Sequence, residues 1–104
     1  METLAISPEG LRGLRLAGEL DLRSLEPLAA AFAALPVEGQ ATLDLSELTF
    51  IDSSGLHAIE EIARVQNGNG PLILTGTPAP VARLLEITNL VEHPGLDIRV
   101  GARG

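Results

Sequence analysis

The sequence predicts an α/β fold, in which a mixed, largely parallel sheet of four to five strands is packed by about three helices. Two observations predict it. Short apolar or alternating runs typical of strands take turns along the chain with segments whose apolar residues recur every three or four positions. The chain has 104 residues, 45% of them hydrophobic, which is enough for one core and too few for two. We therefore expect a single domain over 1–104, with 101–104 as a flexible tail.

The first two elements are expected to be strands. Residues 11–18 alternate in polarity, and the apolar run 3–6 is a candidate hairpin partner. A helix should follow, with Ser24 as its N-cap and Pro36 as its stop. The 3.6-residue spacing places four apolar residues on its buried face: Leu25, Leu28, Phe32 and Leu35.

A second strand–helix pair occupies the middle of the chain. Residues 41–46 alternate as a strand, and a helical pattern begins shortly after Ile51. Its predicted core stripe holds Leu56, Ile59, Ile62 and Ala63, with Gln66 at its end. Its predicted outer face holds His57, Glu60, Glu61 and Arg64, and we expect an ion pair between Glu60 and Arg64.

The last third is expected to hold a turn, a strand, a helix and a final strand. The turn is "NGNG" at 67–70, and the strands are 71–75 and 96–100. Thr77 is expected to cap the helix, with Pro78 at its first position. The helix should bury Val81, Leu84 and Leu85 and end at Asn89.

The composition excludes several classes of partner. Fourteen acidic and seven basic residues give a net charge of -7, which disfavours DNA, RNA and anionic membranes. The aromatic content is only 2%, so base-stacking platforms are missing. No apolar run approaches the ~20 residues of a membrane span and no leader opens the chain, so we expect a cytoplasmic protein with no nucleic-acid partner and no membrane insertion.

The sequence also predicts no metal site, no cofactor and no catalytic residues. There is no cysteine, and His57 and His93 lie too far apart to suggest a metal pair. A serine hydrolase would need Ser53 as nucleophile with His57 as base. A nucleophile elbow requires a glycine two residues before the serine, where this chain has Ile51.

The stretch "FIDSSGLHAIEEI", residues 50–62, carries the most specific signal. Asp52, Ser53 and Ser54 stand together where a strand meets a helix, and each is a good N-cap. One cap suffices, so a hydroxyl is left over beside an acid. A phosphate there would add about -1.5 to -2 charges, which a helix amino terminus tolerates but a docked partner does not. Repulsion from Asp52, and from Asp21 if it lies nearby, would help to release such a partner.

Two motifs resemble the STAS domain of bacterial anti-sigma-factor antagonists: "LAGELDLRS" at 16–24 and "LDLSELTFIDSSGL" at 43–56. The resemblance is strongest over 10–90. It implies a STAS-like α/β fold and a cytoplasmic binding module that regulates sigma-factor-dependent transcription by partner switching. The implied partner is an anti-sigma factor that is itself a serine kinase. The antagonist sequesters it until phosphorylation releases the complex, and a phosphatase resets the cycle.

Carried over to this chain, the resemblance makes Ser53 the phosphoacceptor. The phosphorylation turn and partner-docking surface would hold Asp21, Asp52, Ser54, Gly55 and His57. Many members have a small residue where His57 stands, and the family usually ends with a further helix. The alternative is a non-switching STAS accessory subunit of an ABC-type lipid transport system.

Overall fold

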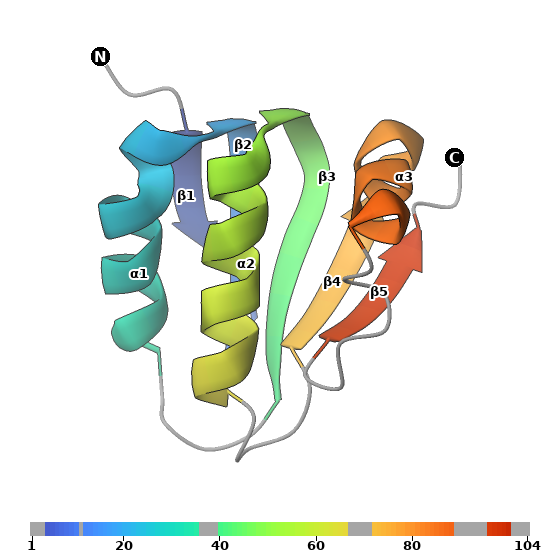
Figure 1. Cartoon of the computed structure of the whole chain (residues 1–104). Helices are drawn as coiled ribbons and strands as arrows, with labels where there is room; N and C mark the ends of the chain where they lie inside the picture. Colours follow the sequence, from blue (N-terminus) through green and yellow to red (C-terminus); the bar gives the residue numbers. More distant parts are fainter. Residues whose placement is uncertain (1–3, 11, 36–39, 67–71, 89–95, 101–104) are drawn as a thin grey trace.

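The computed structural model describes residues 4–10, 12–35, 40–66, 72–88 and 96–100. It confirms the predicted alternation of strands and helices, with one 3-10 helix (η1) added (Figure 1). In chain order the elements are β1 (Leu4–Pro8), β2 (Gly13–Leu20), η1 (Leu22–Ser24), α1 (Leu25–Ala33), β3 (Ala41–Ile51), α2 (Ser53–Gln66), β4 (Leu72–Thr77), α3 (Ala79–Ile87) and β5 (Leu96–Val100).

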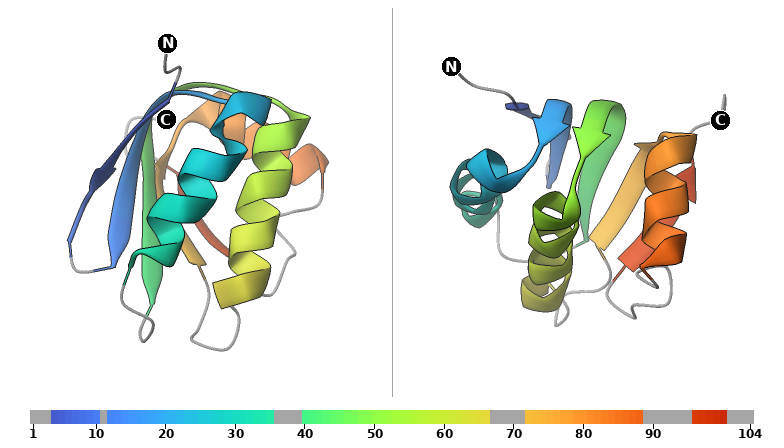
Figure 2. Two further views of the ribbon diagram at one scale, coloured as in Figure 1. Left: turned by 90° about the vertical axis from the view of Figure 1, so that its left-hand side faces the viewer. Right: turned by 45° about the horizontal axis from the view of Figure 1, so that its top comes forward.

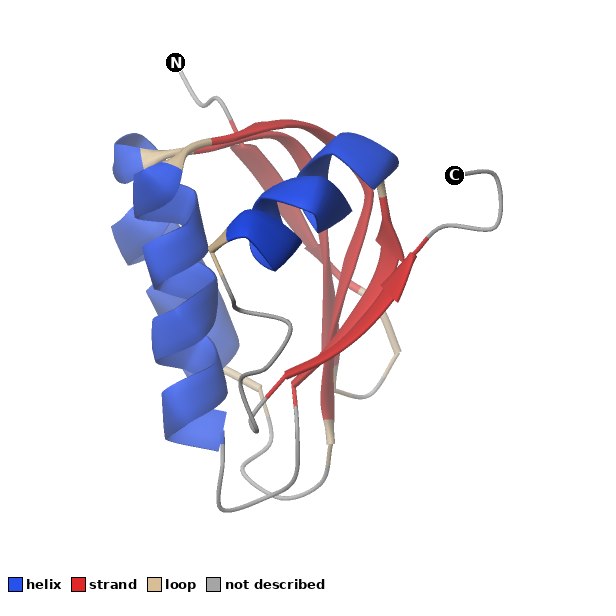
Figure 3. Cartoon of the chain, turned by 45° about the vertical axis from the view of Figure 1, so that its right-hand side comes forward, coloured by secondary structure: helices blue, strands red, loops and turns tan. Residues whose placement is uncertain are grey.

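The five strands form one sheet in the order β1-β2-β3-β4-β5. β1 and β2 pair as the predicted antiparallel hairpin, and every later pair is parallel. Parallel neighbours need crossover connections, and α1, α2 and α3 supply them. All three helices lie over one face of the sheet (Figure 3). The predicted fold class, a mixed and largely parallel sheet with three helices, is confirmed.

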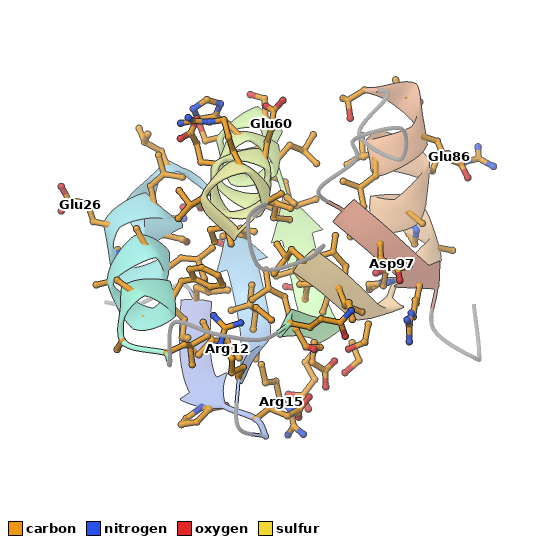
Figure 4. The ribbon with its side chains drawn as sticks, turned by 90° about the horizontal axis from the view of Figure 1, so that it is seen from below. Arg12, Arg15, Glu26, Glu60, Glu86 and Asp97 are labelled. Carbon is orange, nitrogen blue, oxygen red and sulfur yellow. The ribbon has the colours of Figure 1, made fainter. Side chains whose placement is uncertain are left out.

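The core lies between the sheet and the helices. The predicted stripe of α2 is confirmed for Leu56, Ile59, Ile62 and Ala63, which are all buried. The fully buried leucines come mainly from the strands: Leu16, Leu20, Leu43, Leu45, Leu72 and Leu74, with Leu28 from α1 and Leu85 from α3. On the face without helices Arg15 pairs with Glu9, Asp44 and Glu47, and Figure 4 shows its side chain pointing away from the helices.

The predicted N-cap position of Ser24 is confirmed, although its side chain does not cap the helix, and the predicted cap at Thr77 is wrong. Ser24 precedes α1, but its side chain makes no capping bond to that helix. Its hydroxyl instead donates to the carbonyl of Glu19 and accepts the N–H of Asp21, because η1 intervenes before α1. Thr77 is the last residue of β4 and is completely buried, and Pro78 occupies the N-cap position of α3.

Three smaller expectations are also corrected. Leu84 is exposed, and Ala82 joins Val81 and Leu85 on the buried face of α3. Arg64 pairs with Glu61 rather than with Glu60. Strand β3 continues five residues beyond the predicted end, to Ile51. The turn 67–70, the stops at Pro36 and Asn89, the side chain of Gln66 and the tail 101–104 lie outside what the structure describes.

No helix in the described ranges is both long enough and apolar enough to cross a membrane.

Candidate functional site

The turns that follow β2 and β3 lie side by side at one end of the sheet. The two strands are parallel, and Leu20 and Ile51, their last residues, are paired. The N–H of Asp52 donates to the carbonyl oxygen of Leu20 at an N···O distance of 3.3 Å. Figures 1 and 2 show α2 and η1 both starting at this end. The structure therefore brings Asp21 and Asp52, which follow the paired residues, to the same edge.

Asp52 alone caps helix α2. Its Oδ1 accepts the N–H of Gly55, the third helical residue, at 3.0 Å, and its backbone carbonyl accepts the N–H of Leu56 at 3.0 Å. Ser53 is exposed and Ser54 is half-buried. Within the described part of the chain, neither hydroxyl makes a hydrogen bond. The sequence left three candidates for the cap, and the structure assigns it to the acid.

Gly55 is buried against the end of β2. A Cβ at this position would lie 2.5 Å from the carbonyl oxygen of Leu20 and 2.8 Å from Cγ1 of Ile51. Real Cβ atoms do not approach other atoms so closely, so the absence of a side chain lets α2 start directly against the strand ends. The glycine therefore fixes how far Ser53 stands from the turn that follows β2.

Asp21 is buried, and Arg23 neutralises its charge. The backbone N–H of Arg23 donates to Oδ1 of Asp21 at 2.9 Å. The guanidinium Nη2 of Arg23 donates to Oδ2 of Asp21 at 2.6 Å. The hydrogen bond from the guanidinium holds the pKa of Asp21 below its ordinary value. Ser24 completes a capping box around η1. Arg23 also reaches Glu19 at 3.3 Å.

The serine hydrolase arrangement is not assembled. His57 is exposed on α2, one turn after Ser53, and the described residues show no hydrogen bond between the two side chains. A catalytic serine would need such a bond to its base. The described residues also hold no group of three side chains able to bind a metal ion.

Three residues at this site were not expected from the sequence. Arg23 emerges as the counter-ion of Asp21, and Leu22 and Phe50 are exposed beside the turns. An apolar residue between Asp21 and Arg23 is the one signal that could have pointed to Leu22. Phe50 stands two residues after the buried Leu48, so strict alternation along the strand would bury it. A register shift near the end of β3 decides its orientation.

Comparisons with known proteins identify the fold and the family of the chain. The unphosphorylated form of the anti-sigma factor antagonist SpoIIAA has a similar structure, with 19% sequence identity, a TM-score of 0.66, and 91% of this chain and 86% of that chain covered. The STAS domain of an antisigma-factor antagonist from Rhodobacter sphaeroides matches at 17% identity and a TM-score of 0.48, over 96% of this chain and 86% of that one. A family model described as "Mlab, STAS domain" matches residues 6–97. The chain belongs to the STAS domain family.

Proposed function

We propose that this STAS domain is an anti-sigma-factor antagonist that works by partner switching. In its unphosphorylated form it binds an anti-sigma factor that is also a serine kinase, and phosphorylation of Ser53 releases the complex. The observation that supports the proposal is that Ser53 is exposed while Asp52 does the capping. The fold therefore has no structural use for the Ser53 hydroxyl. The domain itself is a binding module that needs neither a catalytic residue nor a cofactor.

The charge of a phosphate explains the release. A phosphoserine at the first position of α2 gains from the helix amino terminus, so the folded domain tolerates it. With a partner docked, water is excluded and the phosphate faces the half-buried Asp52. At about 6 Å, each such repulsion costs roughly 1–3 kcal/mol. Every ~1.4 kcal/mol is tenfold in affinity, so the repulsion from Asp52 alone weakens the complex substantially.

Intact-mass spectrometry tests the proposal. The purified domain is incubated with ATP and an anti-sigma factor kinase from the same genome, and we expect one phosphate to be added. Ser53→Ala should gain none and should stay bound to the kinase in the presence of ATP. Ser54→Ala is the matched control and should behave as wild type. If no phosphate is added by any such kinase that is active on another antagonist, the proposal is wrong.

A second candidate function is the non-switching accessory subunit of an ABC-type lipid transport system. It is favoured by the description of the matching family model, which carries the name Mlab and not that of an antagonist. This function predicts co-purification with an ATPase, in a complex that Ser53→Ala leaves unchanged. Gene neighbourhood distinguishes the two candidate functions. An adjacent gene for a small kinase favours the switch, and adjacent genes for a permease and an ATPase favour the transport subunit.

A further inference from the structure

In the described part of the domain, large apolar side chains are exposed both at the ends of strands and on two helices. Leu22 (69% exposed) and Phe50 (48%) flank the turns that follow β2 and β3. Val65 (71%), Leu84 and Ile87 (72%) lie on α2 and α3. Val65 is twelve residues along α2 from Ser53, which corresponds to about 18 Å at 1.5 Å per residue. The first pair is therefore beside the proposed phosphorylation site, and Val65 is remote from it.

The fold holds Leu22 outward. It is the first residue of η1, and the N-cap Asp21 and the last residue Ser24 of this helix are buried and form the capping box. Arg23 further ties the backbone to the carboxylate of Asp21. A leucine held in this way cannot turn into the core. Because its backbone is already fixed, binding to a partner costs little additional conformational entropy.

Phe50 is likewise fixed, by the strand that carries it. Leu48 and Ile51, two residues before and one residue after it, are buried. Phe50 pairs with Glu19 of β2, one position before the pair Leu20–Ile51 that packs against α2, so its side chain lies on the sheet face without helices. It precedes Ser53 by three residues, so their Cα atoms are at most about 11 Å apart. Leu22 follows Leu20 by two residues, and the carbonyl oxygen of Leu20 accepts a hydrogen bond from the N–H of Asp52. Both residues thus lie at the end of the sheet where α2 begins, Leu22 in η1 and Phe50 at the edge of the face without helices.

A kinase that phosphorylates Ser53 must cover these surroundings. A protein interface of ordinary size covers about 800 Å² on each partner, which corresponds to a disc of about 16 Å radius. A contact surface of this radius around Ser53 reaches Leu22 and, over the end of the sheet, Phe50. Interfaces gain most of their affinity from a few apolar or aromatic anchors within a polar rim. Here Glu19, Arg23 and Asp52 supply the polar rim.

We propose that Leu22 and Phe50 are the two apolar anchors by which the anti-sigma factor kinase binds this domain. This inference rests on the proposed function, because it takes the enzyme that phosphorylates Ser53 as the occupant. The two side chains fill apolar pockets of the kinase and set its active site over the Ser53 hydroxyl.

The test is a binding measurement with the kinase that phosphorylates Ser53 in the experiment above. A non-hydrolysable ATP analogue is present, so affinity is measured without phosphate transfer. Leu22→Ser and Phe50→Ser should each raise Kd at least tenfold. The controls Val65→Ser and Ile87→Ser replace apolar residues that are at least as exposed, and they should change Kd less than about twofold. Leu22→Met and Phe50→Leu keep apolar bulk and should retain most of the affinity, and urea denaturation checks that each variant folds.

Three results would overturn the inference. If all four serine variants bind as wild type while Ser53 is still phosphorylated, the anchors are wrong and the switch stands. If no kinase binds or phosphorylates the wild type, the inference falls together with the proposed function. If Leu22→Ser or Phe50→Ser instead converts a dimer of the free domain to monomer in sedimentation, the two side chains serve contact between copies of this chain.

Discussion

The backbone N–H of Asp52 donates a hydrogen bond to the carbonyl oxygen of Leu20, with an N···O distance of 3.3 Å. This bond joins the end of β2 to the residue that caps α2. The Asp21 turn and the Ser53 turn are therefore parts of one packed unit, although about thirty residues separate them in the sequence. Substitutions in this unit should distinguish three roles by their effect on stability: the helix cap of Asp52, the close contact of Gly55 and the modifiable hydroxyl of Ser53.

Asp52→Ala should destabilise the domain by about 1 kcal/mol, because the N–H of Gly55 loses its acceptor. Asp52→Asn keeps an acceptor and should cost less. Ser53→Ala removes an exposed hydroxyl and should stay within about 0.5 kcal/mol of wild type. Urea denaturation with an unchanged m value measures all three. Equal destabilisation by Ser53→Ala and Asp52→Ala would mean that the cap is assigned to the wrong side chain.

Gly55→Ala should destabilise by roughly 1–3 kcal/mol, because the added methyl would collide with the carbonyl of Leu20 and with Ile51. The expectation is informative since alanine is otherwise better than glycine in a helix by about 1 kcal/mol. Ser54→Ala, one position earlier, is the control for helix propensity and should be neutral or mildly stabilising. A more stable Gly55→Ala variant in thermal or urea unfolding would show that the helix has room to move away from β2.

The pKa of Asp21 should be low in the native state because of its hydrogen bond with Arg23. A depressed pKa contributes stability that is present above the unfolded-state value of about 3.9 and is lost as the pH falls through the native value. Arg23→Gln should raise the pKa of Asp21 toward its ordinary value and remove this contribution. An NMR titration of the Asp21 carboxyl carbon measures the shift directly.

Arg64→Gln is the control for that titration, since Arg64 is similarly exposed and pairs with Glu61. It should leave the pKa of Asp21 unchanged. The same low pKa in wild type and Arg23→Gln would contradict the assignment of Arg23 as the cause.

Thr77→Val should stabilise the domain by about 1 kcal/mol. The Oγ1 of Thr77 is buried, and it makes no hydrogen bond with the residues that the structure describes. Valine has nearly the same shape and removes the desolvated hydroxyl. Thr75→Val, at a half-buried position of the same strand, should change stability by no more than about 0.5 kcal/mol. A loss of stability in Thr77→Val would reveal a partner for the hydroxyl.

The sequence by itself determined the order of strands and helices, the buried stripe of α2 and the position of the polar turn at its start. These features follow from local periodicity and from residue types, because a helix or strand that packs on one face must repeat its apolar residues at 3.6 or 2 positions. The predicted hairpin and the parallel sheet followed from the same pattern.

Only the tertiary structure decided which of Asp52, Ser53 and Ser54 caps α2, and that the charge of Asp21 is met by Arg23. It also decided that Leu22 and Phe50 are exposed whereas Thr77 is buried. The physical reason for the arrangement around Asp21, Asp52 and Phe50 is that the ends of β2 and β3, distant along the chain, meet at one edge of the sheet, whereas Thr77 is buried by the packing of β4. The pairing of Leu20 with Ile51 determines which residues of the two turns lie next to each other. This register arises from the packing of the sheet as a whole.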